Sequence, residues 1–282
     1  MDEQHFEVFG RRLAALTRRN PGGLKVLALH GWLDNAASYL PLSAELDDYD
    51  LVALDMAGHG QSDHRGADGE YNIWNDLPDI EAVTDALGWE QFNLVGHSRG
   101  AVVSCLYAAT RPERIRRLVL LDGIAAHAAD PAASVDQLAA FLRDKKRLLD
   151  RPGRVIPDID TAVELRQQNG MGLSPVAARL ITERGLRQVE GGWCWSHDAR
   201  LQGASAFKLT AAHLETVMGG LSMPVLLLLA QQGFGAREAV IPSVPDSMTI
   251  EEVAGGHHCH MDEAVEDIAR RLRDFLALEA KA

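Results

Sequence analysis

The sequence predicts a doubly wound α/β fold, with a mostly parallel sheet covered by helices on both faces. Short apolar runs alternate with helical patterns between residues 25 and 121. The run at 114–121 is almost continuously apolar at its end, as in strands that are buried on both faces of a parallel sheet. A strand and a helix near residue 98 are joined by a turn flanked by glycines. Alternating strands and helices are typical of this fold class.

The elements of the first half follow in chain order. Segments 6–8 and 12–17 predict a hairpin that turns at Gly10-Arg11. Strands are then expected at 25–29, 50–54, 91–95 and 114–121, and helices at 36–46, at 74–87 and directly after residue 98.

The regular alternation stops after residue 125. Residues 126–220 are mostly helical in pattern and rich in alanine, leucine and arginine. A dense aromatic and polar patch at 193–198 is expected to anchor them on the core, with a position facing the substrate as the alternative. Strands return at 225–230 and 248–253, and an amphipathic helix is expected at 262–278. We therefore expect a core domain of residues 1–125 and 221–282, with a helical cap inserted at 126–220.

Composition narrows the class of partner and the compartment. Lys and Arg number 28 against 40 Asp and Glu, a net charge of −12, which disfavours nucleic acid and anionic membranes as partners. The three cysteines are scattered and odd in number, so we expect no disulfide framework. The N-terminus has no basic leader, and the longest apolar run, 225–230, is far too short for a membrane span. We expect a cytoplasmic protein.

Residues 96–100, Gly-His-Ser-Arg-Gly, fit the G-x-S-x-G pattern of a nucleophile elbow. A strand leads into Ser98 and a helix leaves it, which is the context that gives this pattern its meaning. Neighbours on either side of the serine must lack bulk because the turn is tight. The helix then directs its free N–H groups and the positive end of its dipole at a developing anion. An ordinary glycine-rich turn is the alternative.

A serine hydroxyl needs a base, and the base needs an orienting acid. In this architecture the three follow the chain order serine, acid, histidine. His257, directly after Gly256 and between the last strand and the last helix, is our choice for the base. His258 is the second candidate, and His260 is expected to pack or hydrogen-bond at the helix start. Three clustered histidines also suggest a metal site, but no acidic or cysteine set elsewhere completes a ligand geometry, so we expect no metal.

Three carboxylates are candidates for the acid. Asp122 is favoured because it ends the strand at 114–121, which should lie beside the elbow strand, and functional groups gather at the carboxyl ends of such strands. Glu238, the first carboxylate after the strand at 225–230, is the second candidate, and Asp246 ranks below it. Capping of the next turn is the alternative role for Asp122.

An oxyanion hole needs two backbone N–H groups, which we expect from Arg99 and Trp32. The Trp32 side chain is expected to line the substrate pocket, with core packing as the alternative, and we place His97 in the same pocket. The Arg99 side chain either contacts an anionic substrate group or, as we favour, pairs with an acidic neighbour.

These motifs resemble α/β-hydrolases over nearly the whole chain. The resemblance rests on His-Gly-Trp at 30–32, on the pattern Asp-x-x-Gly-His-Gly-x-Ser at 55–62, on the elbow, and on Gly-His-x-x-His at 256–260. Residues 30–35, HGWLDN, further resemble the serine hydrolase-like subgroup. The resemblance implies an eight-stranded, mostly parallel sheet with a helical cap. It also implies hydrolysis through an acyl-enzyme without a cofactor.

One departure concerns the acid, which many such enzymes carry just after the strand equivalent to 225–230. Some family members carry it after the preceding sheet strand, which Asp122 matches, as one type of haloalkane dehalogenase does. Those dehalogenases and the epoxide hydrolases use an aspartate nucleophile, and Ser98 argues against both chemistries here.

The expected function is hydrolysis of a small acyl ester through Ser98, His257 and Asp122. Thioesterases, lactonases and carbon–carbon bond hydrolases use the same triad, and fold and triad do not choose among them. A small-molecule-binding protein without catalysis is the alternative from another class, suggested by the displaced acid. The sequence leaves the substrate and the oligomeric state open.

Overall fold

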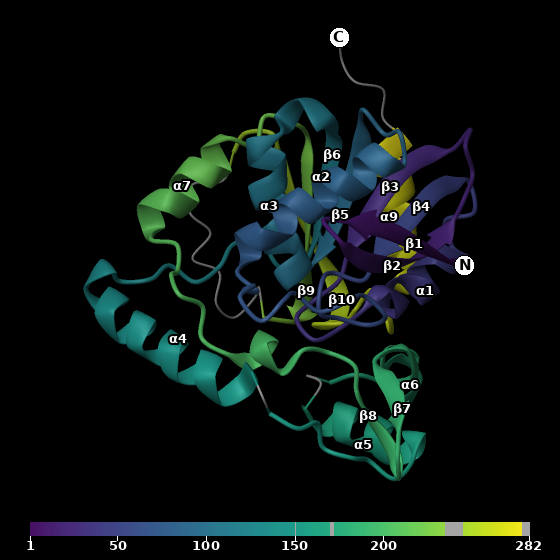
Figure 1. Cartoon of the computed structure of the whole chain (residues 1–282). Coiled ribbons are helices and arrows are strands. Elements are labelled where there is room, and N and C mark those ends of the chain that lie inside the picture. Colours follow the sequence, from purple (N-terminus) through teal and green to yellow (C-terminus); the bar gives the residue numbers. More distant parts are fainter. Residues whose placement is uncertain (150, 170–171, 235–244, 278–282) are drawn as a thin grey trace.

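A computed structural model of the chain describes residues 1–149, 151–169, 172–234 and 245–277. Its centre is an eight-stranded sheet with the strand order β1-β2-β4-β3-β5-β6-β9-β10 (Figure 1). The β2 strand pairs antiparallel with both its neighbours, and the strands from β4 to β10 pair in parallel. The expected eight-stranded, mostly parallel sheet is therefore confirmed. The strands are β1 (Asp2–Val8), β2 (Arg11–Arg18), β3 (Leu24–Leu29), β4 (Tyr49–Leu54), β5 (Phe92–His97), β6 (Ile115–Leu121), β9 (Val225–Gln232) and β10 (Met248–Gly256).

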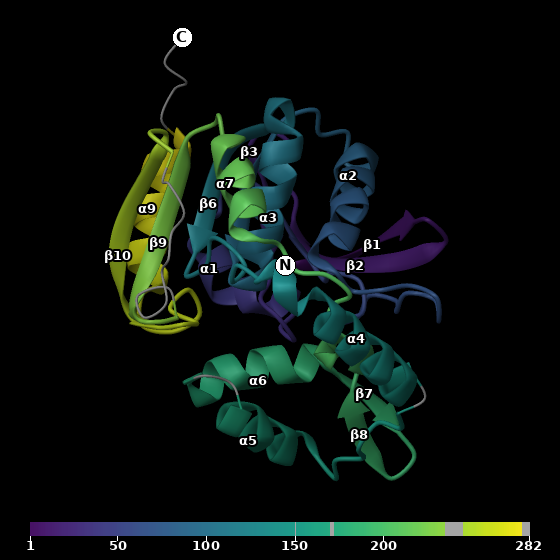
Figure 2. The ribbon, with the colours of Figure 1, turned by 90° about the vertical axis from the view of Figure 1, so that its left-hand side faces the viewer.

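Helices cover both faces of this sheet, as Figure 2 shows. One face packs on α2 (Leu77–Ala86), α3 (Arg99–Thr110) and α7 (Ala211–Gly219), and the other on α1 (Leu40–Ala44) and α9 (Val265–Ala277). Side chains of β3 alternate between the two layers, with Leu27 and Leu29 on one side and Val26 and Ala28 on the other. This double burial explains why the parallel strands are apolar at nearly every position.

Most of the segment between β6 and β9 forms a separate layer at the carboxyl edge of the sheet (Figures 1 and 2). It holds α4 (Ser134–Leu149), α5 (Ile159–Asn169), α6 (Pro175–Arg184) and a hairpin of β7 (Leu186–Val189) and β8 (Gly192–Trp195). Its last helix, α7, differs, because Met218 packs in the main core beside α3. The cap layer thus ends before α7, earlier than the expected boundary at residue 220.

Polar contacts tie this cap to the core. The Asp198 amide donates to the Gly58 carbonyl at 2.9 Å, and the Tyr71 hydroxyl donates to the Asp198 carboxylate at 2.7 Å. The Arg184 guanidinium donates to the Asp55 carboxylate at 3.0 Å. The patch at 193–198 therefore anchors the cap, as the sequence predicts. Among the described residues, no helix is long and apolar enough to cross a membrane.

Candidate active site

The turn between β5 and α3 has the strained geometry of a nucleophile elbow. Ser98 has φ +52° and ψ −116°, a backbone conformation that residues with a side chain rarely adopt, and it is partly exposed. A Cβ at Gly96 would lie 2.5 Å from the Ser104 hydroxyl oxygen, and a Cβ at Gly100 would overlap the Leu29 carbonyl oxygen. Both glycines are therefore required for this turn, as the motif predicts.

Asp122 and His257 meet beside this elbow. The Nδ1 atom of His257 lies 2.6 Å from Oδ2 of Asp122, and both side chains are almost fully buried. Asp122 directly follows β6, and the Ser98 amide donates to the carbonyl of Leu121, the residue before Asp122, at 3.0 Å. The structure thus gathers the three predicted residues at the carboxyl ends of β5, β6 and β10.

The Asp122 carboxylate also holds the end of β9. Oδ1 accepts a hydrogen bond from the Ala230 amide at 3.1 Å, and Oδ2 accepts one from the Phe234 amide at 3.0 Å. Asp122 itself has φ +44°, which is uncommon for a residue with a side chain. Three N–H donors therefore fix both carboxylate oxygens, with His257 Nδ1 as the third.

Of the other candidate acids, the structure describes only Asp246, which does not lie at this edge. Asp246 is exposed and precedes β10, so it lies at the amino end of a strand whose carboxyl end carries the site. Glu238 lies outside the described residues.

His97 and His258 lie behind His257 rather than in an open pocket. Nε2 of His97 lies 2.9 Å from the His257 carbonyl oxygen, and because a carbonyl only accepts, this nitrogen carries the proton. The His97 ring centroid is 4.2 Å from that of His260. His97 has no exposed surface, so it supports the histidine loop and differs from the expectation that it lines the substrate pocket. Burial lowers the pKa of His97 well below its usual value and that of His260 to about 3, which keeps both neutral.

Asp34 joins this histidine cluster from the loop after β3. Its Oδ2 lies 3.1 Å from Nε2 of His258, and its Oδ1 accepts a hydrogen bond from Arg166 of the cap helix α5. Burial opposes ionisation of Asp34, but the neighbouring His258 and Arg166 hold its pKa well below the usual range. Asp34, His97 and His258 have ligand atoms within 4.8 Å of one another and could hold a metal ion. The sequence analysis did not identify Asp34 as the acid that completes this set, although Asp34 lies in the HGWLDN segment that resembles the serine hydrolase-like subgroup.

Two backbone N–H groups near Ser98 are available for a ligand. The Asp34 amide donates to the Gly31 carbonyl at 3.2 Å, which closes a turn with Leu33 at φ +58°. Such a turn leaves the N–H of its second residue, Trp32, unpaired. The Arg99 N–H is equally free because it opens α3. Within the described part of the chain neither amide has an acceptor, as an oxyanion hole requires.

A cavity of about 380 Å³ opens between this edge and the cap. Trp32, Arg99 and the loop at 69–73 form its floor on the side of the core, and α4 with residues 200–205 lines it on the side of the cap. The Trp32 indole N–H donates to the Leu201 carbonyl at 2.9 Å, so this side chain spans core and cap and is not part of the core. The cavity is therefore lined by both residues that carry the free amides, and one of them, Arg99, directly follows Ser98.

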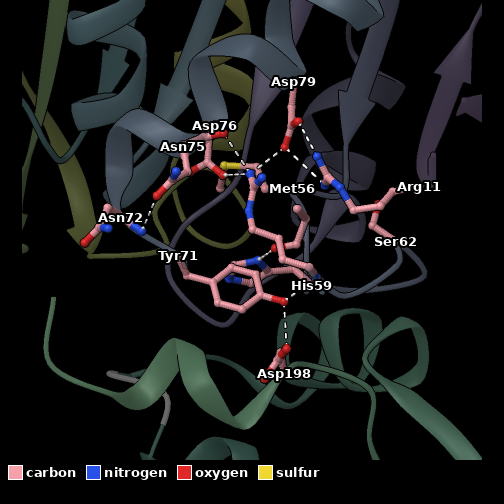
Figure 3. Close-up of polar contacts among 12 residues, drawn as sticks. Arg11, Met56, His59, Ser62, Tyr71, Asn72, Asn75, Asp76, Asp79 and Asp198 are labelled. Carbon is pink, nitrogen blue, oxygen red and sulfur yellow. Dashed lines mark hydrogen bonds and ion pairs between the residues drawn. The ribbon is translucent and has the colours of Figure 1, made fainter. Parts of the chain in front are cut away.

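The Arg99 side chain pairs with an acid, as the sequence analysis favours, and also lines the cavity. Its Nη2 donates to Asp76 at 2.7 Å, and its Nη1 lies 3.4 Å from the Met56 sulfur. Figure 3 shows Asp76 and Met56 side by side above Tyr71, which reaches down to Asp198 of the cap.

Comparison with known proteins agrees with this geometry. The strand order and the elbow are those of the α/β-hydrolase class, and a family model described as "alpha/beta hydrolase fold" matches residues 26–151. The chain is 29% identical over 268 residues to a serine hydrolase-like protein of Danio rerio, covering 90% of this chain and 82% of that protein. It is 28% identical to serine hydrolase-like protein 2 of Homo sapiens, with 90% and 87% covered.

Two further relatives extend the comparison. The crystal structure of a hypothetical protein from Pseudomonas aeruginosa PAO1 superimposes with a TM-score of 0.94 at 38% identity, covering 99% of this chain and 100% of that one. A 2-(acetamidomethylene)succinate hydrolase of Mesorhizobium japonicum is 32% identical over 190 residues, 62% of this chain and 68% of that protein. The chain belongs to the α/β-hydrolase superfamily, within its serine hydrolase-like subgroup.

Proposed function

We propose that this chain is a serine hydrolase that cleaves small acyl esters with Ser98, His257 and Asp122. The observation that carries the proposal is the 2.6 Å hydrogen bond between His257 Nδ1 and Asp122, formed at the strand edge that presents Ser98. A carboxylate that accepts from Nδ1–H fixes the tautomer in which Nε2 is free to take a proton.

The reaction follows from these positions. His257 takes the proton of the Ser98 hydroxyl while the serine oxygen attacks the ester carbonyl carbon. The N–H groups of Trp32 and Arg99 then stabilise the tetrahedral oxyanion, and losing one such donor costs about 100- to 1,000-fold in rate. His257 returns its proton to the leaving alkoxide, which departs as the alcohol. Water, activated by the same histidine, attacks the acyl-enzyme and releases the acid. The reaction uses side chains, backbone and water alone.

The size and walls of the cavity support a small substrate. A volume of about 380 Å³ is near the lower end of the range of roughly 300–1,000 Å³ for small-molecule sites. Trp32, Phe141 and Leu148 supply apolar wall beside charged residues. We also propose a cytoplasmic location, because Cys105, Cys194 and Cys259 are free and buried, as suits a reducing compartment.

The test compares wild type with Ser98→Ala on p-nitrophenyl esters from acetate to decanoate, together with labelling by a fluorophosphonate probe. Wild type should hydrolyse the short esters and label, and Ser98→Ala should fold yet do neither. Ser222→Ala, an exposed serine before β9, is the matched control and should match wild type. Hydrolysis that survives Ser98→Ala refutes the serine mechanism, and a folded wild type that neither hydrolyses nor labels favours a binding protein.

A further inference from the structure

Buried charges support the floor of the cavity at Arg99. Three arginines, from the start of β2, from the loop before α2 and from the start of α3, share two carboxylates at the start of α2. We name this set the arginine network: Arg11, Arg65, Arg99, Asp76 and Asp79. Figure 3 shows Arg11 beside Asp79, and Asp76 on the same side of the site. All five side chains are at most 15% exposed.

The arginine network carries one positive charge more than it carries negative charges. Asp79 accepts from Arg11 at 2.7 Å and from Arg65 at 2.5 Å. Asp76 lies 3.3 Å from Arg65 and 2.7 Å from Arg99. Because Asp76 is shared with Arg65, it does not fully neutralise Arg99.

The other charged residues that line the cavity are matched one to one. Lys145 lies 3.6 Å from Glu70, Arg200 lies 2.6 Å from Asp198, and Asp144 lies 2.8 Å from Arg147. The unmatched positive charge of the described cavity wall is therefore at the arginine network, whose member on the cavity is Arg99.

Arg99 also keeps hydrogen-bond capacity for a ligand. A guanidinium has five N–H donors, and the described partners of Arg99 are one carboxylate oxygen and the thioether sulfur of Met56, which is a weak acceptor. The adjacent His59 adds no charge. Burial is the main cause that lowers its pKa well below the usual value, and electrostatic repulsion by His30 and Arg99 lowers this pKa further. A desolvated guanidinium with free donors fits a carboxylate, whose two oxygens match its planar fork.

We propose that the Arg99 side chain binds a carboxylate of the substrate, so that the enzyme prefers esters that carry an anionic group over neutral esters of equal length. The inference rests on the proposed function and names its substrate class. Arg99 follows Ser98 directly and lines the cavity, so in this proposal the carboxylate lies on the guanidinium while the ester group reaches toward the serine. The carboxylate belongs either to the acyl part or to the alcohol part, and two substrate pairs separate these sources.

The test measures kcat/KM in a pH-stat for monoethyl glutarate against ethyl valerate, and for 4-(butyryloxy)butanoate against butyl butyrate. Charge-assisted hydrogen bonds of the usual strength predict a preference of about 10- to 100-fold for the charged member of one pair. The pair that shows it identifies which part of the substrate carries the anion.

Variants of the arginine network give changes of opposite sign. Arg99→Met should reduce the ratio of charged to neutral ester to about 1, and Arg99→Lys should restore part of it, because the ratio cancels any general loss of rate. Asp76→Asn should raise the ratio, because Arg99 loses its one carboxylate partner. A disruption of the fold would not produce this opposite pair of shifts. Arg116→Met is the control for the change of charge, because Arg116 is exposed near the amino end of β6, and it should leave the ratio unchanged.

A binding measurement separates this inference from the proposed function. Glutarate should raise the melting temperature of wild type but not that of Arg99→Met. Ratios near 1 in wild type, or ratios unchanged by Arg99→Met, overturn the carboxylate site while leaving the esterase intact. A glutarate shift that needs Arg99, in a protein that hydrolyses no ester and does not label, supports the site and refutes the proposed hydrolysis.

Discussion

Replacement of Asp122 by asparagine tests the proposed triad most directly. Each oxygen of the carboxylate accepts from N–H groups: Oδ1 from Ala230, and Oδ2 from Phe234 and His257. An amide keeps one oxygen and replaces the other by an NH₂ group, which only donates. In either orientation, Asp122→Asn therefore sets one NH₂ group against an N–H donor or against the His257 ring.

The size of the effect follows from the orientation adopted. If the NH₂ group faces His257, the imidazole takes the tautomer with Nε2–H and no longer removes the serine proton. A wrong tautomer in a serine triad costs about 10⁴-fold in kcat, which is about 5.5 kcal/mol of barrier. If the NH₂ group instead faces Ala230, a buried donor loses its acceptor, which costs about 1–3 kcal/mol of stability. We expect the first, because it keeps the acceptor of the buried Ala230 N–H, and only the partly buried Phe234 N–H loses its acceptor.

The assay measures kcat for p-nitrophenyl acetate together with the free energy of unfolding in urea. The exposed Asp246→Asn is the matched control and should match wild type. Glu238→Gln tests the second candidate and is also expected to keep its activity. A folded Asp122→Asn enzyme that retains a tenth or more of the wild-type kcat would refute the assignment of the acid, most directly if Glu238→Gln had lost its activity.

Three further predictions concern stability. Gly100→Ala drives a methyl group into a strand carbonyl and should cost several kcal/mol or prevent soluble expression, whereas Gly219→Ala, with open space around it, should stay within about 1 kcal/mol of wild type in the same urea titration. Arg166→Gln leaves the buried Asp34 carboxylate without its arginine and should cost about 3 kcal/mol, and a melting temperature equal to that of wild type would show that the cap contact is dispensable. The pKa of His260 falls to about 3 in the folded protein, so below pH 6.5 the unfolded chain gains a proton that the folded chain does not. The free energy of unfolding should therefore fall by about 1.4 kcal/mol for each unit by which the pH is lowered. Urea titrations from pH 7.5 to 5 should show this slope, and the slope should be smaller in His260→Leu.

Local patterns were enough to predict the sheet and the elbow. Every expected sheet strand is present, with no end shifted by more than four residues, because parallel strands buried on both faces show their apolar runs directly. The glycines around Ser98 are needed by sterics within a few residues, so the motif alone predicts the turn. The choice of Asp122 over later carboxylates needed only the rule that functional groups gather at the carboxyl ends of parallel strands.

Contacts between distant segments were beyond such patterns. The hairpin of β7 and β8 in the cap is short, and its Glu190-Gly191 turn lies in a segment dominated by helical composition. Asp34 meets His258 across 224 residues, and Arg99 meets Asp76 across 23 residues and two elements. Such contacts form only after the sheet has brought the loops together, so the local sequence does not indicate which side chains will meet. The contacts of Asp34 and of the arginine network were therefore not predicted from the sequence.

The position of the acid shows how one fold supplies the same group from two strands. In the arrangement that the family resemblance implies, the strand equivalent to β9 ends in the acid. Here β9 ends in backbone N–H groups instead, and those of Ala230 and Phe234 hold the carboxylate that β6 supplies. A Cβ at Gly233 would overlap that carboxylate, so the turn after β9 must lack a side chain at this point. The two strands are hydrogen-bonded neighbours, with Leu121 opposite Leu228. An acid after either strand therefore reaches the same histidine. The condition is that the end of the other strand leaves room for the carboxylate and that its backbone N–H groups hydrogen-bond to it.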